Sequence, residues 1–251
     1  MKAEIAQFIR EAIPDFHRKR LESLSSLKLN IVLKRKNPYL YRAKNITTAS
    51  ELVTGIVDAH LSSMEETVFG AFLENIAIYA CSIALKGYKS GIEGIDLEFV
   101  SNGIRYIVTI KSGPAWGNSG QISKMRQNFR KASVILKQTG TVKSVQAING
   151  CCYGIGHTDK GDYEKICGES FWTLISGDPK LFIDIIEPLG NKAKERNEAF
   201  LTEYSKVINL FTKEFLDHFC GSDGLIDWEK LVRFNSAART KTSRTSKKLR
   251  E

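Results

Sequence analysis

The sequence has only five cysteines, and their spacing follows no regular pattern. An odd number of irregularly spaced cysteines argues against a disulfide framework. No unbroken apolar run approaches the roughly 20 residues of a membrane span, and the N-terminus lacks the apolar stretch of a signal peptide. Internal repeats are absent as well. We therefore expect a soluble, intracellular protein with no membrane partner.

The composition that is present is that of an ordinary folded chain. Of 251 residues, 42% are hydrophobic, which is enough for a normal core. We expect one domain over residues 1–236, with an N-terminal helical part at 1–60, a central core at 61–178 and a C-terminal helical part at 179–236. Residues 237–251 are rich in Thr, Ser, Lys and Arg and are expected to form a flexible basic tail.

The formal net charge of +9 is concentrated at the two ends of the chain. Residues 1–45 carry 11 Lys and Arg against 4 acids, and residues 230–251 carry 8 against 1, which leaves −5 for the middle. Basic ends around a mildly acidic centre fit arms that bind a polyanion and a centre that holds metal ions. A charged tail can equally serve solubility alone, so charge does not decide between these readings.

Two runs of alternating polar and apolar residues flank Asn102-Gly103 within residues 94–111. Because this dipeptide suits a type I′ turn, we expect a β-hairpin with Asp96 opposite Thr109 and Glu98 opposite Ile107. One face of the hairpin then carries Asp96, Glu98, Thr109 and Lys111. The other face is apolar and is expected to consist of Ile95, Leu97, Phe99, Tyr106, Val108 and Ile110. Two acids, a hydroxyl and an ammonium group on one face suit a metal-dependent hydrolytic site, and a simply solvated face is the alternative.

A further acid lies in an apolar segment ahead of the hairpin. Ser63 to Glu66 has the pattern of a capping box, so we expect a largely buried helix from there to about Leu85. Glu74 interrupts its apolar residues, and a buried carboxylate needs a cation, a proton or a special partner. A structural salt bridge is the simpler explanation for this residue.

The segment after the hairpin predicts alternating helix and strand. Ser119 is expected to cap an amphipathic helix that ends near Gln138, and Val142–Ile148 and Phe171–Ser176 to form strands. The polar side of the helix carries cations and no acid, which favours phosphate contacts: Lys124, Arg126, Arg130, Lys131 and Lys137. The pattern indicates an α/β (α+β) fold, a mixed sheet flanked by helices.

Three smaller features complete the pattern. Residues 3–24 predict an amphipathic helix with a kink near Pro14, which packs in the core or in a dimer contact. The basic turn Lys34-Arg35-Lys36 either contacts phosphate or is solvated. Cysteines 151, 152 and 167 with His157 could be imagined as zinc ligands, but adjacent cysteines are poorly spaced for chelation, so we interpret them as small buried residues.

Several ordered blocks resemble type II restriction endonucleases of the PD-(D/E)xK superfamily. They extend from about residue 30 to about residue 236 and comprise Asn37–Asn45, Gly94–Phe99, Tyr106–Gly113, Trp116–Asn118, Cys151–Gly154, Phe171–Gly177 and Asp227–Leu231. The resemblance implies a restriction-endonuclease-like fold with extra helices at both ends. It also implies a sequence-specific, metal-dependent endonuclease that cuts double-stranded DNA and leaves 5′-phosphate ends.

The resemblance assigns roles to the hairpin residues. Asp96 is expected to bind Mg²⁺ through hard oxygen atoms, together with the backbone carbonyl of Ile110, and Lys111 to lie beside the attacking water. The second acid of the family would occupy position 109, where this chain has threonine, which cannot replace a carboxylate. Either a neutral ligand suffices here, or an acid from elsewhere supplies the charge. We favour Glu74, as a metal ligand, with Glu98 as the alternative acid.

The partners also follow from the resemblance: double-stranded DNA, a second copy in a two-fold dimer and a cognate DNA methyltransferase, in the cytoplasm of a prokaryotic cell. A GGNCC-like target is suggested. Basic and amide side chains are the expected DNA contacts: Lys34, Arg35, Lys36, Asn118, Gln121, Lys124, Arg126 and Arg130. Two alternatives stay open, a non-catalytic DNA-binding protein whose hairpin acids are structural and a repair or structure-specific nuclease on the same fold.

Overall fold

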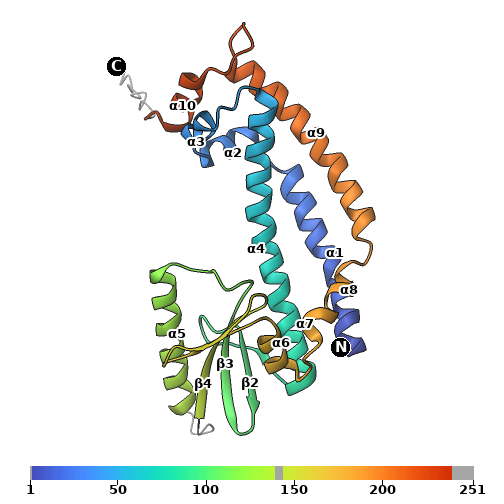
Figure 1. Ribbon diagram of the computed structural model, residues 1–251, viewed down its shortest axis with the longest axis vertical. Coiled ribbons are helices and arrows are strands. Elements are labelled where there is room, and N and C mark those ends of the chain that lie inside the picture. Colours follow the sequence, from blue (N-terminus) through green and yellow to red (C-terminus); the bar gives the residue numbers. More distant parts are fainter. Residues whose placement is uncertain (1, 139–143, 239–251) are drawn as a thin grey trace, which may run out of the picture. The chain divides into compact units, whose positions relative to one another are not determined.

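The computed structural model describes residues 2–138 and 144–238 of the chain. The chain forms two compact units (Figure 1): unit 1 comprises Met1–Arg20 and Ser63–Ala199, and unit 2 comprises Leu21–Ser62 and Phe200–Glu251. Three helices contribute residues to both units, namely α1 (Ala3–Ser25), α4 (Ala49–Leu85) and α9 (Ala193–Phe219). The single domain expected over 1–236 stays a prediction. Most of the expected tail, from residue 239 onward, lies outside the described residues.

Unit 1 contains a mixed β-sheet, as the sequence predicts. Within the described ranges six strands form it in the order β1-β2-β3-β4-β6-β5. The neighbours β3 and β4, and β4 and β6, are parallel, whereas the other pairs are antiparallel. The strands are β1 (Tyr88–Lys89), β2 (Leu97–Ser101), β3 (Ile104–Lys111), β4 (Ser144–Cys151), β5 (His157–Asp159) and β6 (Glu164–Cys167).

The predicted hairpin is present in the predicted register. Glu98 pairs with Ile107 and Ser101 pairs with Ile104. Asn102 and Gly103 have φ values of 50° and 76°, the positive values that a type I′ turn requires at both central residues. The Asn-Gly dipeptide therefore fixes which residues of β2 and β3 face each other.

Helices cover both faces of the sheet (Figure 1). On one face, Leu97, Phe99 and Val108 pack with side chains of α1, α4 and α6 (Gly168–Ser176). On the other, Ile107 packs with α5 (Ser119–Gln138). The face that carries Thr109 is thus largely covered by a helix. The alternative that this face is simply solvated was wrong.

The face expected for Ile95 was also wrong. This residue belongs to the cluster around Ile107 and α5, not to the cluster around Leu97. Ile95 precedes the first residue of β2, and its N–H donates to the carbonyl of Ile92 in a turn (3.1 Å). Strict alternation of side chains applies only inside the strand.

Two further expectations were wrong. Helix α4 begins at Ala49, and Thr48 Oγ1 accepts from the N–H of Glu51 (3.2 Å), so Ser63 lies inside the helix and caps nothing. Residues 171–176 form the second part of helix α6, which ends at Gly177 with a left-handed φ of 70°. Short apolar runs of this length fit a buried strand or a buried helix equally well, and the C-terminal glycine is the signal that favours the helix.

Helix α4 is apolar over much of its length. Among the described residues it is the one helix that is long and apolar enough to cross a membrane. The sequence analysis did not single it out, because polar residues interrupt its apolar runs. The core helix of a soluble protein passes the same test. Phe72, Ile76, Ala77 and Ala80 of α4 are buried in the core of unit 1. The absence of a membrane partner stays a prediction.

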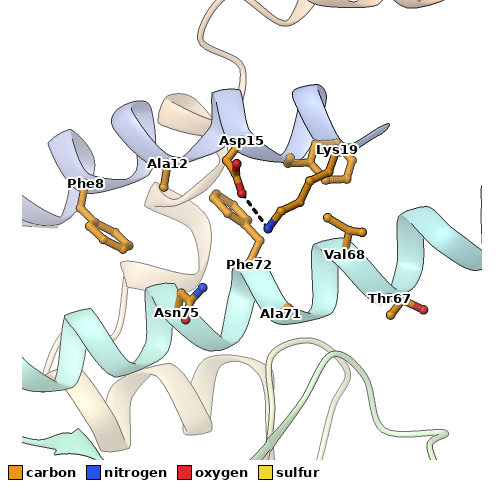
Figure 2. A pocket seen from close by; sticks show the side chains of 10 residues that line it. Phe8, Ala12, Asp15, Lys19, Thr67, Val68, Ala71, Phe72 and Asn75 are labelled. Carbon is orange, nitrogen blue, oxygen red and sulfur yellow. Dashed lines mark ion pairs between the residues drawn. The ribbon is translucent and has the colours of Figure 1, made fainter. Parts of the chain in front are cut away.

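Helix α1 forms at the predicted place and continues through Pro14. In unit 1, a cavity of about 390 Å³ lies between α1 and α4 (Figure 2). Its walls are mainly apolar, with Phe8, Phe16 and Phe72 among them. Its acid, Asp15, is paired with Lys19 at 2.7 Å. A cavity with one neutralised carboxylate offers little for hydrolytic chemistry.

The remaining helices of unit 1 are short, α7 (Leu181–Asp184) and α8 (Ile186–Leu189). Unit 2 contains α2 (Leu29–Arg35), α3 (Pro38–Ala43) and α10 (Trp228–Ser236), with parts of α1, α4 and α9. Asn235 Nδ2 donates to the carbonyls of Leu33 (2.9 Å) and Lys36 (3.2 Å), which ties α10 to the end of α2. The basic turn at 34–36 is thus held by unit 2.

Candidate active site

A cavity of about 780 Å³ in unit 1 brings together many of the predicted site residues. It lies at the end of β3, between α4 and α5. Six predicted residues line it: Glu74, Asp96, Ile110, Lys111, Gln121 and Lys124. Thr109 and Trp116 line it as well.

Asp96 is held in place by the hairpin itself. Its backbone N–H donates to the carbonyl of Val108 (2.9 Å), and its side-chain Oδ2 accepts from the N–H of Ile110 (2.7 Å). The carboxylate therefore takes the place of a strand carbonyl at the point where the ladder ends. This bond fixes the carboxylate next to Ile110 and one residue away from Lys111.

Glu74 projects from α4 into the same cavity and is half-buried. Burial raises the pKa of its carboxyl above the ordinary value of 4.5, and the nearby carboxylate of Asp96 raises this pKa further. Lys89 and Lys111 act in the opposite direction without offsetting the rise. The salt bridge offered as the simpler explanation exists, but the Lys89 ammonium lies 3.7 Å away and is 68% exposed.

Thr109 lines the cavity without adding charge. It is 3% exposed. Its hydroxyl lies 3.4 Å from Met125 Sδ of α5 and accepts from Asn149 Nδ2 (3.3 Å). The position at which the resembled family has its second acid is therefore occupied by a neutral, hydrogen-bonded side chain.

Glu98 is not brought into the cavity. It is 3% exposed and bound by Arg105 Nη1 (2.9 Å), Ser90 Oγ (2.7 Å) and Tyr88 OH (3.3 Å). The partner Tyr88 lies in β1, directly beside Glu98. Glu98 thus receives donors from both neighbouring strands, Tyr88 from β1 and Arg105 from β3.

Asn118 and Gln121 are occupied at the start of α5. The N–H of Gln121 donates to Asn118 Oδ1 (3.1 Å), and the N–H of Asn118 donates to Gln121 Oε1 (2.9 Å). This reciprocal pair is a capping box, so the helix has the predicted bounds but Asn118, not Ser119, caps it. Of the two, Gln121 lines the cavity.

Three cations of α5 have acidic partners, which the sequence did not indicate. Arg126 and Arg130 each lie 3.5 Å from Asp162, and Lys124 lies 3.8 Å from Glu93. The acids come from other segments, so a search of the helix alone missed them. These long, exposed ion pairs contribute little to stability and leave the cations able to exchange partners.

The remaining predicted residues lie elsewhere. Lys34, Arg35 and Lys36 belong to unit 2, where Lys34 lies over the ring of Phe234 (5.1 Å). The three cysteines 151, 152 and 167 are buried, and His157 bonds to Glu164. Over the described ranges, no group of three or more His, Cys, Asp or Glu could hold a metal, and the absence of zinc stays a prediction.

The model of the family described as type II restriction endonuclease EcoO109I matches residues 3–197. The chain belongs to this family. The match includes every residue of the cavity, and the membership indicates a nuclease that cleaves DNA at specific sequences. The expected resemblance to type II restriction endonucleases is thereby confirmed, and the assignment to the PD-(D/E)xK superfamily stays a prediction. No curated protein matches the chain.

Two residues at or near the cavity, Trp116 and Asn149, were not among the predicted site residues. Trp116 was recognised only as part of a motif, although its ring lies 5.2 Å from the Lys111 ammonium. Asn149 was overlooked, although it is 1% exposed and accepts from the Trp116 indole N–H (3.0 Å). A polar amide within the otherwise apolar run Ala147–Cys151 was the signal available.

Proposed function

We propose that the protein hydrolyses phosphodiester bonds of double-stranded DNA in a metal-dependent reaction, with Asp96, Glu74 and Lys111 as the catalytic residues. The observation that carries the proposal is the shared cavity, which brings two acids and an ammonium group together at the end of β3 in a chain of the restriction endonuclease family. The products would carry 5′-phosphate and 3′-hydroxyl ends.

The donor set of the cavity suits Mg²⁺. This ion prefers oxygen ligands and is usually bound through one or two carboxylates while it keeps several waters, so a dedicated cage of three acids is not required. Asp96, Glu74 and the backbone carbonyl of Ile110 would hold it. A divalent cation would also offset the repulsion that raises the pKa of Glu74. A bound Mg²⁺ would neutralise negative charge on the scissile phosphate.

The protein's own groups supply placement and charge. The Ile110 N–H holds the Asp96 carboxylate at one position. Lys111, the last residue of β3, presents its ammonium to the same cavity and would orient the attacking water and stabilise the negative charge that develops on the phosphate. Water adds to phosphorus as the bond to the 3′-oxygen breaks, and the 3′-oxygen leaves with a proton.

We further propose that the protein acts as a homodimer on a palindromic site, in a restriction-modification system with a cognate DNA methyltransferase, in the cytoplasm of a prokaryotic cell. A two-fold dimer would present one cavity to each DNA strand. Gln121 and Lys124 line the cavity and are the predicted DNA-contact residues nearest to the site. Such a site-specific nuclease requires a protected host genome, which accounts for the methyltransferase.

The test is digestion of unmethylated plasmid and phage DNA with Mg²⁺ and with EDTA, followed by sequencing of the fragment ends. The proposal predicts discrete fragments that begin with a 5′-phosphate, formed only with Mg²⁺. Binding without any cutting would identify a non-catalytic DNA-binding protein, and cutting without fixed fragments would identify a repair or structure-specific nuclease. Either result would overturn the proposal.

A further inference from the structure

A row of three polar residues crosses the sheet beneath the loop that follows the lysine. Thr109 of β3 is in register with Asn149 of β4, and Asn149 is in register with Lys165 of β6. Residues paired in this way project from the same face of a sheet. The three side chains therefore form one line under the loop of residues 112–118, which connects β3 to α5.

This row holds the loop at two points. Asn149 Oδ1 accepts from the indole N–H of Trp116 (3.0 Å), and Lys165 Nζ donates to the carbonyl of Pro114 (2.7 Å). Asn149 is itself fixed, because its Nδ2 donates to Thr109 Oγ1 (3.3 Å). The loop ends in the reciprocal cap of α5. The indole is thus anchored to the sheet and not left to the conformational freedom of a loop.

The face of the anchored indole meets the lysine. The Lys111 ammonium lies 5.2 Å from the centroid of the Trp116 ring, within the range of a cation–π contact. Both residues are half-buried and line the same cavity. A long lysine side chain has many conformations, and contact with a fixed aromatic face restricts them to those that keep the ammonium in the cavity.

We propose that Trp116, held by Asn149, is the positioning residue for the Lys111 ammonium. The inference rests on the proposed function, since it assigns Lys111 a catalytic role. It also explains what Thr109 does at the position of the expected acid, because this residue supports, through Asn149, the ring that holds the lysine. Trp116 acts through Lys111 and not on the DNA.

The experiment measures two quantities for each variant: the single-turnover cleavage rate with Mg²⁺ and enzyme in excess, and the DNA dissociation constant with Ca²⁺ in place of Mg²⁺. Trp116→Leu removes the ring, and we expect its cleavage rate to fall about 3- to 30-fold, the range that a cation–π contact supports, with the dissociation constant unchanged. Trp116→Phe keeps an aromatic face without the anchoring N–H and should lose less.

A double-mutant cycle separates positioning from a general structural role. In a Lys111→Met background there is no ammonium to place, so Trp116→Leu should cause no further loss in the residual rate. Asn149→Ala, which removes the anchor but leaves the ring, should resemble Trp116→Phe. The control Trp228→Leu removes another indole with a cation over its ring, that of Arg42 in unit 2, and should leave the cleavage rate unchanged. Thermal unfolding of each variant verifies that it is folded.

Three results would overturn the inference. Trp116→Leu could cleave at the wild-type rate, its loss could appear in DNA binding instead of cleavage, or the loss could be undiminished in the Lys111→Met background. A wild-type protein that cuts no DNA overturns the proposed function, and this inference with it. Wild-type cutting together with any of the three results overturns the role of Trp116 alone.

Discussion

Asp96 and Glu98 are two residues apart in the same hairpin, yet their surroundings are opposite. Glu98 is bound by an arginine, a serine and a tyrosine, all from nearby in the sequence. Asp96 is held through one backbone N–H and shares a cavity with Glu74, a second acid whose pKa is raised. The carboxylate of Glu98 is paired with Arg105, whereas the carboxylate of Asp96 lies near a second carboxylate, that of Glu74.

This difference in surroundings distinguishes Asp96 from Glu98 better than burial does. A buried carboxylate whose charge is paired adds little net stability to the fold. Removing one partner of the pair is nevertheless costly, because the other charge is then buried and unpaired. Burial and repulsion from Asp96 raise the pKa of Glu74, and the nearby ammonium groups of Lys89 and Lys111 do not offset this rise. A bound cation would relieve the repulsion between these two carboxylates, which supports the metal site proposed above.

The largest effect should come from Asp96→Asn. The amide oxygen can still accept from the Ile110 N–H, so the fold should be retained, but the negative charge for the metal is lost. We expect the cleavage rate to fall by about 1,000-fold or more, equivalent to about 4 kcal/mol. Cleavage with Mg²⁺ and DNA binding with Ca²⁺ measure the two properties separately. A variant that cuts at the wild-type rate would place the site elsewhere.

Glu98→Ala should show the opposite pattern. Removing this acid leaves Arg105 without its carboxylate partner; because the arginine is partly exposed, we expect a loss of about 2–3 kcal/mol in the free energy of unfolding, below the usual range for fully buried pairs. The cleavage rate well below the melting temperature should stay near that of the wild type. Urea unfolding measures the loss. Normal stability with abolished cleavage would instead make Glu98 the second catalytic acid.

Glu74→Gln should raise the unfolding temperature and weaken DNA cleavage. Because the pKa of Glu74 is raised, the folded protein holds this proton more tightly than the unfolded chain, so the stability of the wild type falls as the pH rises above about 4.5. The glutamine variant lacks this loss. In EDTA it should unfold at a higher temperature than the wild type at pH 7, by about 2–4 °C per kcal/mol relieved. This advantage should shrink toward pH 4, and Mg²⁺-dependent cleavage should be weaker.

The smallest effect concerns Asp162, whose carboxylate lies near two cations of α5. Asp162→Asn should free Arg126 and Arg130 for phosphate and tighten DNA binding by about 2- to 5-fold, since exposed ion pairs contribute about 0–1 kcal/mol. The variant should also show a steeper dependence of affinity on salt. Titration of labelled DNA at several salt concentrations measures both. Unchanged affinity and salt dependence would mean that these arginines do not contact DNA.

The sequence predicted local geometry well and distant partners poorly. The hairpin register followed from Asn102-Gly103, because a two-residue turn fixes every pair in the two strands. Asp162 near the α5 arginines could not be foreseen, since this contact depends on how separate segments pack. Asn149 meets Thr109 through parallel pairing of strands joined by a long helix, and no local pattern encodes that register.

The hydrogen bond from Ile110 to Asp96 gives the molecule a built-in reporter. This amide proton is protected from exchange with deuterated solvent only while the carboxylate accepts it. Its exchange rate therefore records, without any DNA or metal, how often the end of the hairpin opens and the site comes apart.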